Sequence, residues 1–367
     1  MARTDPGGRR ISPAKMIVFS LLPVVILLVS AEIGLRLWAN HFRTSYERYN
    51  YARGRLELVP NVDVRTADGD EFRINSKGFL GPEWPDAKPD GTYRIFALGD
   101  SCTFGDGHWQ RAYPALLERL LDARDPHAGF EVINAGIEGY GSDYALDRIR
   151  TELLSYHPDM VLVYIGWNDL MKVDPENAAA AGKHAWVAES MERSYLTKAY
   201  KKVLFYYLRP LVMSPQPGGD EAELHAFDRF VPLKYQANLE AIVAALEADG
   251  VQPVLLTLPT VVRSDMTADD LKRQHVVFPY YAGSYSVGRF LSLHRAYNRV
   301  IRATAARHDL AFVDLDAVFN GRDKRDLFWD TMHPSYKGHA LIAQSIFDAI
   351  GPLRLHHDVV AAAANRR

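Results

Sequence analysis

A chain of 367 residues is long enough for one large domain or two of ordinary size. Its apolar fraction of 48% fits a globular protein with a sizeable core, and a formal net charge of −2 gives no reason to expect a nucleic-acid partner. The single cysteine, Cys102, excludes an internal disulfide and an all-cysteine metal site. It leaves the redox compartment undecided, since a secreted protein of this size can do without disulfides.

The N-terminal region has the pattern of a targeting or membrane segment. A basic tail, residues 1–15, precedes an apolar segment at 16–38. This segment is predicted to be an uncleaved transmembrane anchor, with a cleaved signal peptide as the alternative because Val29-Ser30-Ala31 resembles a cleavage site. A buried core helix is a further alternative, which the isolated position of the apolar run behind a basic tail disfavours. The anchor is favoured because the apolar character continues past that site. Since a long following domain is translocated largely irrespective of charge, we expect the tail in the cytoplasm and the remainder outside, in the periplasm or extracellular space.

The rest of the chain divides into an N-terminal extension, residues 39–92, and a regular region, residues 93–350. Within the extension, residues 71–84 are predicted to form a short strand, a turn and an extended segment. In the regular region, short apolar runs alternate with amphipathic stretches, which predicts a parallel sheet covered by helices on both faces. The five predicted strands are 93–99, 130–136, 160–166, 253–259 and 311–315.

Two insertions, residues 170–233 and 260–288, follow the third and fourth predicted strands. Ligands of open α/β sheets bind at the carboxyl ends of the strands, so we expect both insertions to shape the binding site. Residues 278–288 have the composition of a mobile loop. Residues 194–208 have helical spacing, and their aromatic stripe is predicted to be buried by ordinary packing, with a membrane-facing surface as the alternative. Residues 351–367 form a C-terminal tail.

Ser101 directly follows the first predicted strand, in the sequence Gly-Asp-Ser. A serine at this place is exposed at the end of the sheet and is a candidate nucleophile. It is also a common helix N-cap, and on its own the capping role would be the better interpretation. The surrounding residues match neither the G-x-S-x-G nucleophile elbow nor a phosphate-binding loop.

Three further groups carry chemistry. Asp330 and His333 are three residues apart before a predicted helix, so that the carboxylate can orient the imidazole as a general base. A surface pair or a metal site is the alternative, but no other His, Asp or Glu group has compelling ligand spacing. Asn168 ends a buried strand, where its amide can stabilise an oxyanion or simply form a turn. Gly139 lies in a glycine-rich turn, where it either simply turns the chain or offers its backbone N–H to the same oxyanion.

In this order, the four groups resemble the SGNH (GDSL-type) hydrolase superfamily. The four blocks appear as GDSCTFGDG (99–107), NAGIEG (134–139), GWND (166–169) and DTMHP (330–334). The resemblance spans about residues 93–350, and the combination is more specific than any single block. It implies a three-layer α/β/α sandwich of the flavodoxin-like type around a five-stranded parallel sheet, in agreement with the strands predicted above.

The resemblance also implies roles for individual residues. Ser101 would be the nucleophile, His333 the base and Asp330 the residue that orients the base. The oxyanion hole would consist of the N–H groups of Ser101 and Gly139 and the side chain of Asn168. Neither a cofactor nor a metal is expected.

Two residues depart from the family pattern. Cys102 replaces an aliphatic residue and is expected to serve packing. Trp167 replaces a smaller residue and is predicted to contact the substrate, narrowing the acyl pocket in favour of short acyl groups such as acetyl. In the alternative interpretation its ring faces away from the site.

The predicted function is that of a membrane-anchored serine esterase acting on small acyl esters, O-acetyl esters among them, outside the cytoplasm. The same acyl-enzyme chemistry would serve an O-acyltransferase that modifies a cell-envelope polysaccharide. A non-catalytic glycan-binding domain and a lysophospholipase are further alternatives. The predicted partners are an ester or acylated glycan and the membrane, while the oligomeric state is left open.

Overall fold

The computed structural model describes residues 12–42, 46–50, 53, 55–65, 71–105, 108–126, 128–173, 175, 194–203, 217–278 and 286–351. Several predicted segments lie outside this set: most of the basic tail, half of the first insertion, the centre of the loop at 278–288, and nearly all of the C-terminal tail. The chain forms two compact units. One comprises Met1–Thr44 and Ala179–Ser214, and the other comprises Ser45–Ala178 and Pro215–Arg367.

The second unit is built on a five-stranded sheet in which every neighbouring pair is parallel. The spatial order is β6-β5-β7-β8-β9, which is the doubly wound order of flavodoxin-like folds. The strands are β5 (Thr92–Gly99), β6 (Gly129–Gly136), β7 (Met160–Tyr164), β8 (Gln252–Leu256) and β9 (Ala311–Val313). The predicted fold class and all five predicted strands are confirmed.

The last three strands end two or three residues before their predicted ends. The apolar residues that extended the predictions, such as Ile165 and Leu258, are buried in the turns after the strands. Leu315 is buried as well, but it begins the helix α14 (Leu315–Asn320). Hydrophobicity reports burial and not strand geometry, so an apolar run can continue past the last ladder hydrogen bond.

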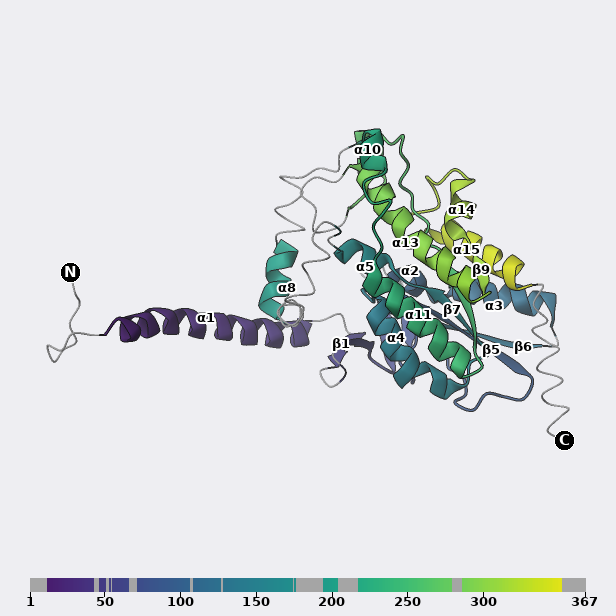
Figure 1. The fold of residues 1–367 in the computed structure, drawn as a ribbon. Helices are drawn as coiled ribbons and strands as arrows, with labels where there is room; N and C mark the ends of the chain where they lie inside the picture. The colour runs from purple at the N-terminus through teal and green to yellow at the C-terminus, as the bar shows by residue number, and fades with distance from the viewer. Residues whose placement is uncertain are drawn as a thin grey trace. The chain divides into compact units, whose positions relative to one another are not determined.

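Helices cover both faces of the sheet. α3 (Tyr113–Arg124) and α15 (Tyr336–Ile350) pack together on one face, and α4 (Ser142–Thr151), α11 (Leu233–Ala248) and α13 (Val287–Arg307) form the layer on the other face. Figure 1 shows α11 and α13 on the near side of the strands. In α15, Ile342, Ile346 and Ile350 recur at helical spacing and are fully buried, as expected of a core-facing stripe.

The remaining described helices of this unit are short. They are the helices α2 (Ser101–Phe104), α5 (Trp167–Lys172), α10 (Glu221–Leu224) and α12 (Ala268–Arg273) and the 3₁₀ turns Trp109–Arg111 and Leu153–Tyr156.

The N-terminal extension lies along the edge strand β6. It contains two antiparallel pairs, β1 (Glu47–Asn50) with β2 (Arg55–Leu58) and β3 (Val62–Arg65) with β4 (Glu71–Ile74). Beyond β4, Leu80 forms a β-bridge to Asn134 of β6. The buried Arg94 of β5 fixes the following segment, because its guanidinium donates to the carbonyl of Pro85 (2.9 Å) and lies 4.9 Å from the ring of Trp84.

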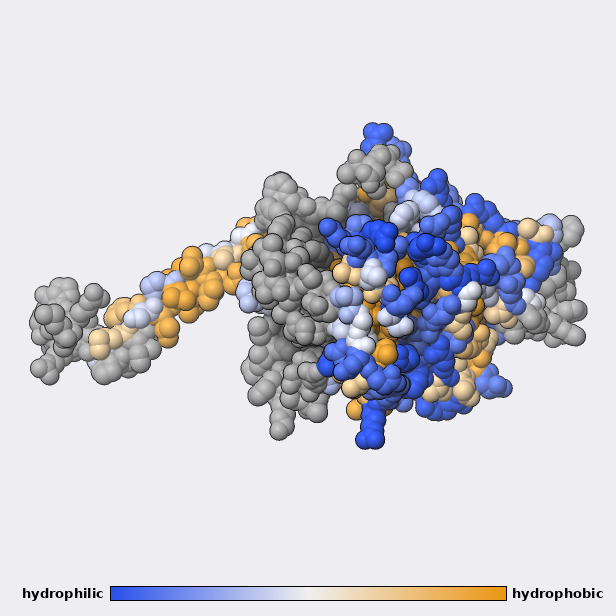
Figure 2. All heavy atoms as spheres, turned by 90° about the horizontal axis from the view of Figure 1, so that it is seen from above, coloured by the Kyte–Doolittle hydropathy of each residue, from blue (hydrophilic) through white to orange (hydrophobic). Residues whose placement is uncertain are grey.

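The first unit pairs α1 (Pro13–Phe42) with α8 (Tyr195–Lys202). The stretch Phe19–Leu37 of α1 is long and apolar enough to cross a membrane, and none of it is buried. Figure 2 shows the apolar residues of this helix in orange. α8 confirms the predicted helix over 195–202. Tyr195 is buried, as the packing interpretation requires, whereas Tyr200 is 65% exposed.

Within this unit, a carboxylate of α1 caps the N-terminus of α8. Glu32 accepts hydrogen bonds from the backbone N–H groups of Tyr195 (2.9 Å) and Leu196 (2.8 Å) and from the hydroxyl of Ser194 (2.9 Å). One turn further along α1, Arg36 donates to the same carboxylate at 2.7 Å. Glu32 and Arg36, the charged pair inside the apolar stretch, therefore bind each other, and Glu32 also binds the start of α8.

Candidate active site

Ser101 lies at the sharp turn between β5 and α2. Gly99 ends the strand, and a Cβ there would stand 2.0 Å from the hydroxyl of Thr103 and 2.7 Å from the carbonyl oxygen of Tyr164. Only glycine lets α2 fold back this closely over the strand end. Asp100 is the N-cap, and its carboxylate accepts from the N–H of Cys102 at 2.9 Å. The capping role belongs to Asp100, so Ser101 is the first helical residue and its hydroxyl is available for another partner.

That partner is His333. The Oγ of Ser101 is 2.8 Å from Nε2 of His333, and Nδ1 of His333 is 2.7 Å from Oδ2 of Asp330. Asp330 is held in turn by the N–H groups of Met332 (3.0 Å) and His333 (2.9 Å), which donate to its other oxygen. The structure thus brings three of the predicted site residues into one hydrogen-bonded line. Ser101 and His333 are both partly exposed, so a ligand can reach them.

The turn that carries Asp330 and His333 is fixed by buried threonines that the sequence analysis missed. The hydroxyl of Thr331 donates to the carbonyl of Val277 (2.9 Å) and accepts from its N–H (2.7 Å). The carbonyl of Thr331 accepts from the hydroxyl of Thr260 at 2.7 Å. These partners lie more than 50 residues away in the sequence, so no local pattern could have indicated them.

Asn168 lies in the first turn of α5, directly after β7. Its Nδ2 is 3.5 Å from Oδ2 of Asp100, which places it beside the turn that carries Ser101. Gly139 follows β6, has a φ of +76°, and has no atom within 4 Å of the position that a Cβ would take. Ser101, Gly139 and Asn168 therefore follow three neighbouring strands at their carboxyl ends. The order of these strands reverses at this place, which is where open α/β sheets bind ligands.

Two carboxyl groups near Ser101 have shifted pKa values. Asp100 is fully buried, and this burial raises its pKa to about 6, with a smaller contribution from the charge of Asp169 and an opposing one from the N–H of Cys102. Burial acts in the same direction on Asp330. There the hydrogen bonds and charge of His333 outweigh it, and the pKa of Asp330 lies below its usual value. The two groups therefore differ in charge state at mildly acidic pH, where Asp330 stays ionised.

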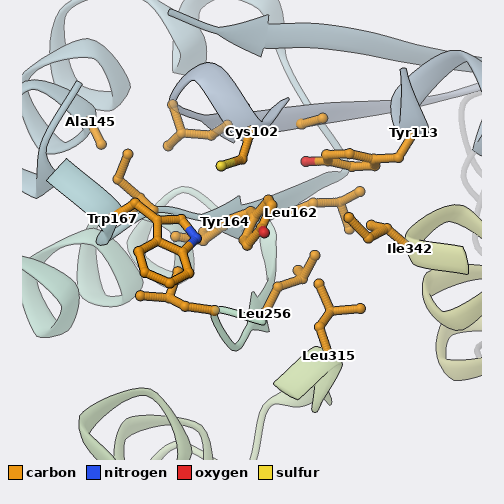
Figure 3. Packing of buried hydrophobic residues seen from close by; sticks show 14 of the residues in the cluster. Cys102, Tyr113, Ala145, Leu162, Tyr164, Trp167, Leu256, Leu315 and Ile342 are labelled. Carbon is orange, nitrogen blue, oxygen red and sulfur yellow. The ribbon is translucent and has the colours of Figure 1, made fainter. Parts of the chain in front are cut away.

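Trp167 and Cys102 both point into the core. Trp167 is 1% exposed, and its ring stacks on that of His294 with a centroid distance of 5.5 Å. Figure 3 shows it among core side chains beside Tyr164. This packing agrees with the alternative in which the ring faces away from the site, and the predicted substrate contact of Trp167 stays a prediction. Cys102 is buried as well, and its thiol donates to the carbonyl of Met332 at 3.4 Å.

Within the part of the chain that the structure describes, no group of three or more His, Cys, Asp or Glu side chains is placed to hold a metal ion. The chemistry available at the site is that of a hydroxyl, an imidazole and a carboxylate in line, with an amide and backbone N–H groups nearby. This set suits nucleophilic attack on a carbonyl group.

Comparison with known proteins agrees with this chemistry. A model of the GDSL-like Lipase/Acylhydrolase family matches residues 97–341, which is more than half of the chain. The chain belongs to this family, and it is an ester-hydrolysing enzyme.

The individual relatives and solved structures share a low sequence identity with this chain. An acetylxylan esterase of Geobacillus stearothermophilus is 25% identical over 280 residues, which cover 74% of this chain and 92% of the relative. A crystal structure of the acetylxylan esterase from that organism matches at 19% identity with a TM-score of 0.43, over 72% of this chain and 95% of the other. An alpha/beta hydrolase from the metagenome of Lake Arreo, Spain, matches at 21% identity with a TM-score of 0.43, over 73% and 98%.

The raised pKa of Asp100 predicts a pH-dependent effect of Asp100→Asn on stability. A folded-state pKa of about 6 against a reference of 3.8 favours folding below about pH 4, and this contribution is lost as the pH rises through 6. The pKa difference corresponds to roughly 3 kcal/mol of folding free energy. The wild-type protein loses this contribution as Asp100 ionises, whereas the variant with a neutral amide does not. In urea unfolding, the free energy of the variant relative to wild type should therefore rise between pH 4 and pH 7. A difference in unfolding free energy that does not change with pH would contradict the raised pKa of Asp100.

Proposed function

We propose that the protein is a serine esterase that hydrolyses small acyl esters, O-acetyl esters among them, outside the cytoplasm. The observation that carries the proposal is the line Ser101–His333–Asp330, with hydrogen bonds of 2.8 and 2.7 Å. The strand-end position of Ser101 and the family membership support the same assignment.

In the proposed mechanism, Nε2 of His333 takes the proton of Ser101 while Oγ attacks the ester carbonyl carbon. The carbonyl electron pair moves onto oxygen, which the N–H groups of Ser101 and Gly139 and the amide of Asn168 stabilise. Asp330 keeps the ring oriented and stabilises the imidazolium. The intermediate then collapses, His333 protonates the leaving alcohol, and an acyl-enzyme ester remains on Ser101. Water, deprotonated by His333, attacks this ester and releases the acid.

The acetyl preference rests on two observations. The relative that matches over most of its length is an acetylxylan esterase, so that an acetylated sugar is a reasonable substrate class for this chain. The second is the place of Trp167 in the chain: it begins α5 directly before Asn168, although its ring packs in the core on that of His294.

A second candidate is transfer of the acyl group to a sugar hydroxyl of an envelope polysaccharide. The same acyl-enzyme serves both reactions, and α1 would keep the site near the cell envelope. Product analysis with and without a glycan acceptor separates the two, since only a transferase makes the acylated glycan.

We further propose that α1 is an uncleaved membrane anchor. Besides the apolar stretch Phe19–Leu37, the contacts of Glu32 support it, because cleavage after Ala31 would place the new chain terminus on the residue that caps α8.

A fluorophosphonate probe tests the proposed nucleophile. The wild-type protein should be labelled and should hydrolyse p-nitrophenyl acetate, and Ser101→Ala should lose both because it removes the hydroxyl that lies 2.8 Å from Nε2 of His333. Ser155→Ala is the matched control, since this exposed serine only donates to a helix carbonyl. Labelling that persists in Ser101→Ala would refute the assignment, and an unlabelled, inactive wild-type protein would favour a non-catalytic glycan-binding domain.

Acyl-chain selectivity tests the role of Trp167. If its side chain limits the acyl pocket, Trp167→Ala should shift activity on nitrophenyl esters from acetyl toward butyryl and longer chains. The ratio of kcat/KM values for the two chain lengths is the measurement, because it cancels any general loss of active protein. An unchanged ratio in a folded variant would assign the ring to packing alone.

The fate of the N-terminus tests the anchor. The full-length protein should stay in the membrane fraction after alkaline carbonate extraction, and protease added outside intact cells should digest the catalytic unit. N-terminal sequencing of the mature protein gives the deciding outcome. A chain that begins at Glu32 and is recovered in soluble form would show a cleaved signal peptide instead.

A further inference from the structure

The side chain that follows Asn168 joins two loops of the site. The carboxylate of Asp169 accepts two hydrogen bonds from one residue, Ser142: its backbone N–H at 2.8 Å and its hydroxyl at 2.6 Å. Ser142 is fully buried at the start of α4, three residues after Gly139. The contact therefore ties the first turn of α5 to the loop that follows β6.

No hydrogen bonds between paired strands join the ends of β6 and β7 directly. β6 and β7 lie on opposite sides of β5 and do not pair with each other. Gly139 and Asn168, the two proposed oxyanion donors outside the nucleophile turn, follow these two separated strands. β5 links the two strands through its own backbone hydrogen bonds, and side-chain contacts join the two loops directly. Among the contacts of the described residues that join these loops, the pair Asp169–Ser142 has the shortest hydrogen bonds.

Neighbouring residues fix the direction of the hydrogen bond between Ser142 and Asp169. Asn238 of α11 donates to the hydroxyl of Ser142 at 2.9 Å, so that the single hydroxyl proton is left to point at Asp169. An ideal Cβ on Gly141 would already stand 3.3 Å from the carboxylate, so a small residue suits this close approach. Both carboxylate oxygens are thereby used on the β6 loop.

A carboxylate is an electrostatically costly choice here. Burial raises the pKa of Asp169 to about 6, although both hydrogen bonds from Ser142 oppose the shift. A neutral side chain would avoid this cost, but it could not accept from both the N–H and the hydroxyl of Ser142 as two equivalent oxygens do.

We propose that Asp169 is a positioning residue for ester hydrolysis: by accepting both hydrogen bonds of Ser142 it fixes the spacing between the Gly139 N–H and the Asn168 amide. This inference rests on the proposed function. It adds a residue that acts through the oxyanion donors and does not itself touch the substrate.

Asp169→Ala tests it on p-nitrophenyl acetate with the full-length protein. Misplacing an oxyanion donor by about 1 Å should lower kcat by roughly tenfold to a hundredfold and leave KM nearly unchanged. Asp314→Ala is the matched control, because Asp314 likewise accepts from a hydroxyl (Thr257, 2.9 Å) and a backbone N–H (Ala317, 3.2 Å) at another strand end. The control should lose stability but keep its kcat.

A double-mutant cycle separates positioning from mere structural support. If Asp169 acts through Asn168, then Asp169→Ala should cost less than about threefold in an Asn168→Ala background. The inference would be overturned if the losses of kcat in the two single variants multiplied in the double variant. A folded Asp169→Ala protein with wild-type kcat would overturn it as well. Should Asp169→Ala not fold, Asp169→Asn and Ser142→Ala decide, since each removes one of the two hydrogen bonds and should lower kcat to an intermediate degree.

The outcome that would refute the proposed function differs from the one that would refute the positioning role. If fluorophosphonate does not label Ser101 in the wild-type protein, the serine mechanism is wrong whatever Asp169 does. If Ser101 is labelled and needed for turnover while Asp169→Ala retains full kcat, only the positioning role is wrong.

Discussion

The close approach of α2 to the end of β5 is the constraint on which the site depends. A side chain at Gly99 would collide with Thr103 and with the backbone of β7, so the strand end and the helix can meet only through a glycine. Asp100 then caps the helix, which leaves Ser101 as its first residue. Of the other groups of the candidate site, Gly139 and Asn168 follow the neighbouring strands β6 and β7, and Asp330 and His333 come together from one turn before α15.

Local patterns were sufficient for the fold and for the groups that lie near strand ends. The strands are buried apolar runs, and Asp330 and His333 are three residues apart, so spacing alone predicted that they could meet. The supporting contacts were not predictable in this way. Asp169 bonds a residue 27 positions earlier and Thr331 one 54 positions earlier, and single serines and threonines give no signal of such pairing. The packing of Trp167 on His294 likewise depends on the complete fold.

Buried carboxyl groups give the site an electrostatic character of its own. Asp100 lies 3.5 Å from the amide of Asn168 and Asp169 follows Asn168 in the chain, and burial raises the pKa of both carboxyl groups to about 6. Each nevertheless accepts backbone N–H groups that a non-polar side chain would leave unsatisfied. Loop geometry is thus secured at the expense of charge burial, a compromise that is common where function and stability place different demands on the same residues.

The covered edge of the sheet has a consequence for solution behaviour. Strand edges offer free N–H and C=O groups to other chains, and a parallel sheet has two such edges. On β6, the bridge from Leu80 and the carboxylate of Glu118, which accepts from the N–H of Val132 at 2.7 Å, occupy outward-facing groups. At the opposite edge, β9 has only three residues. The five-stranded sheet therefore offers little template for strand-to-strand aggregation, even where many copies are crowded together.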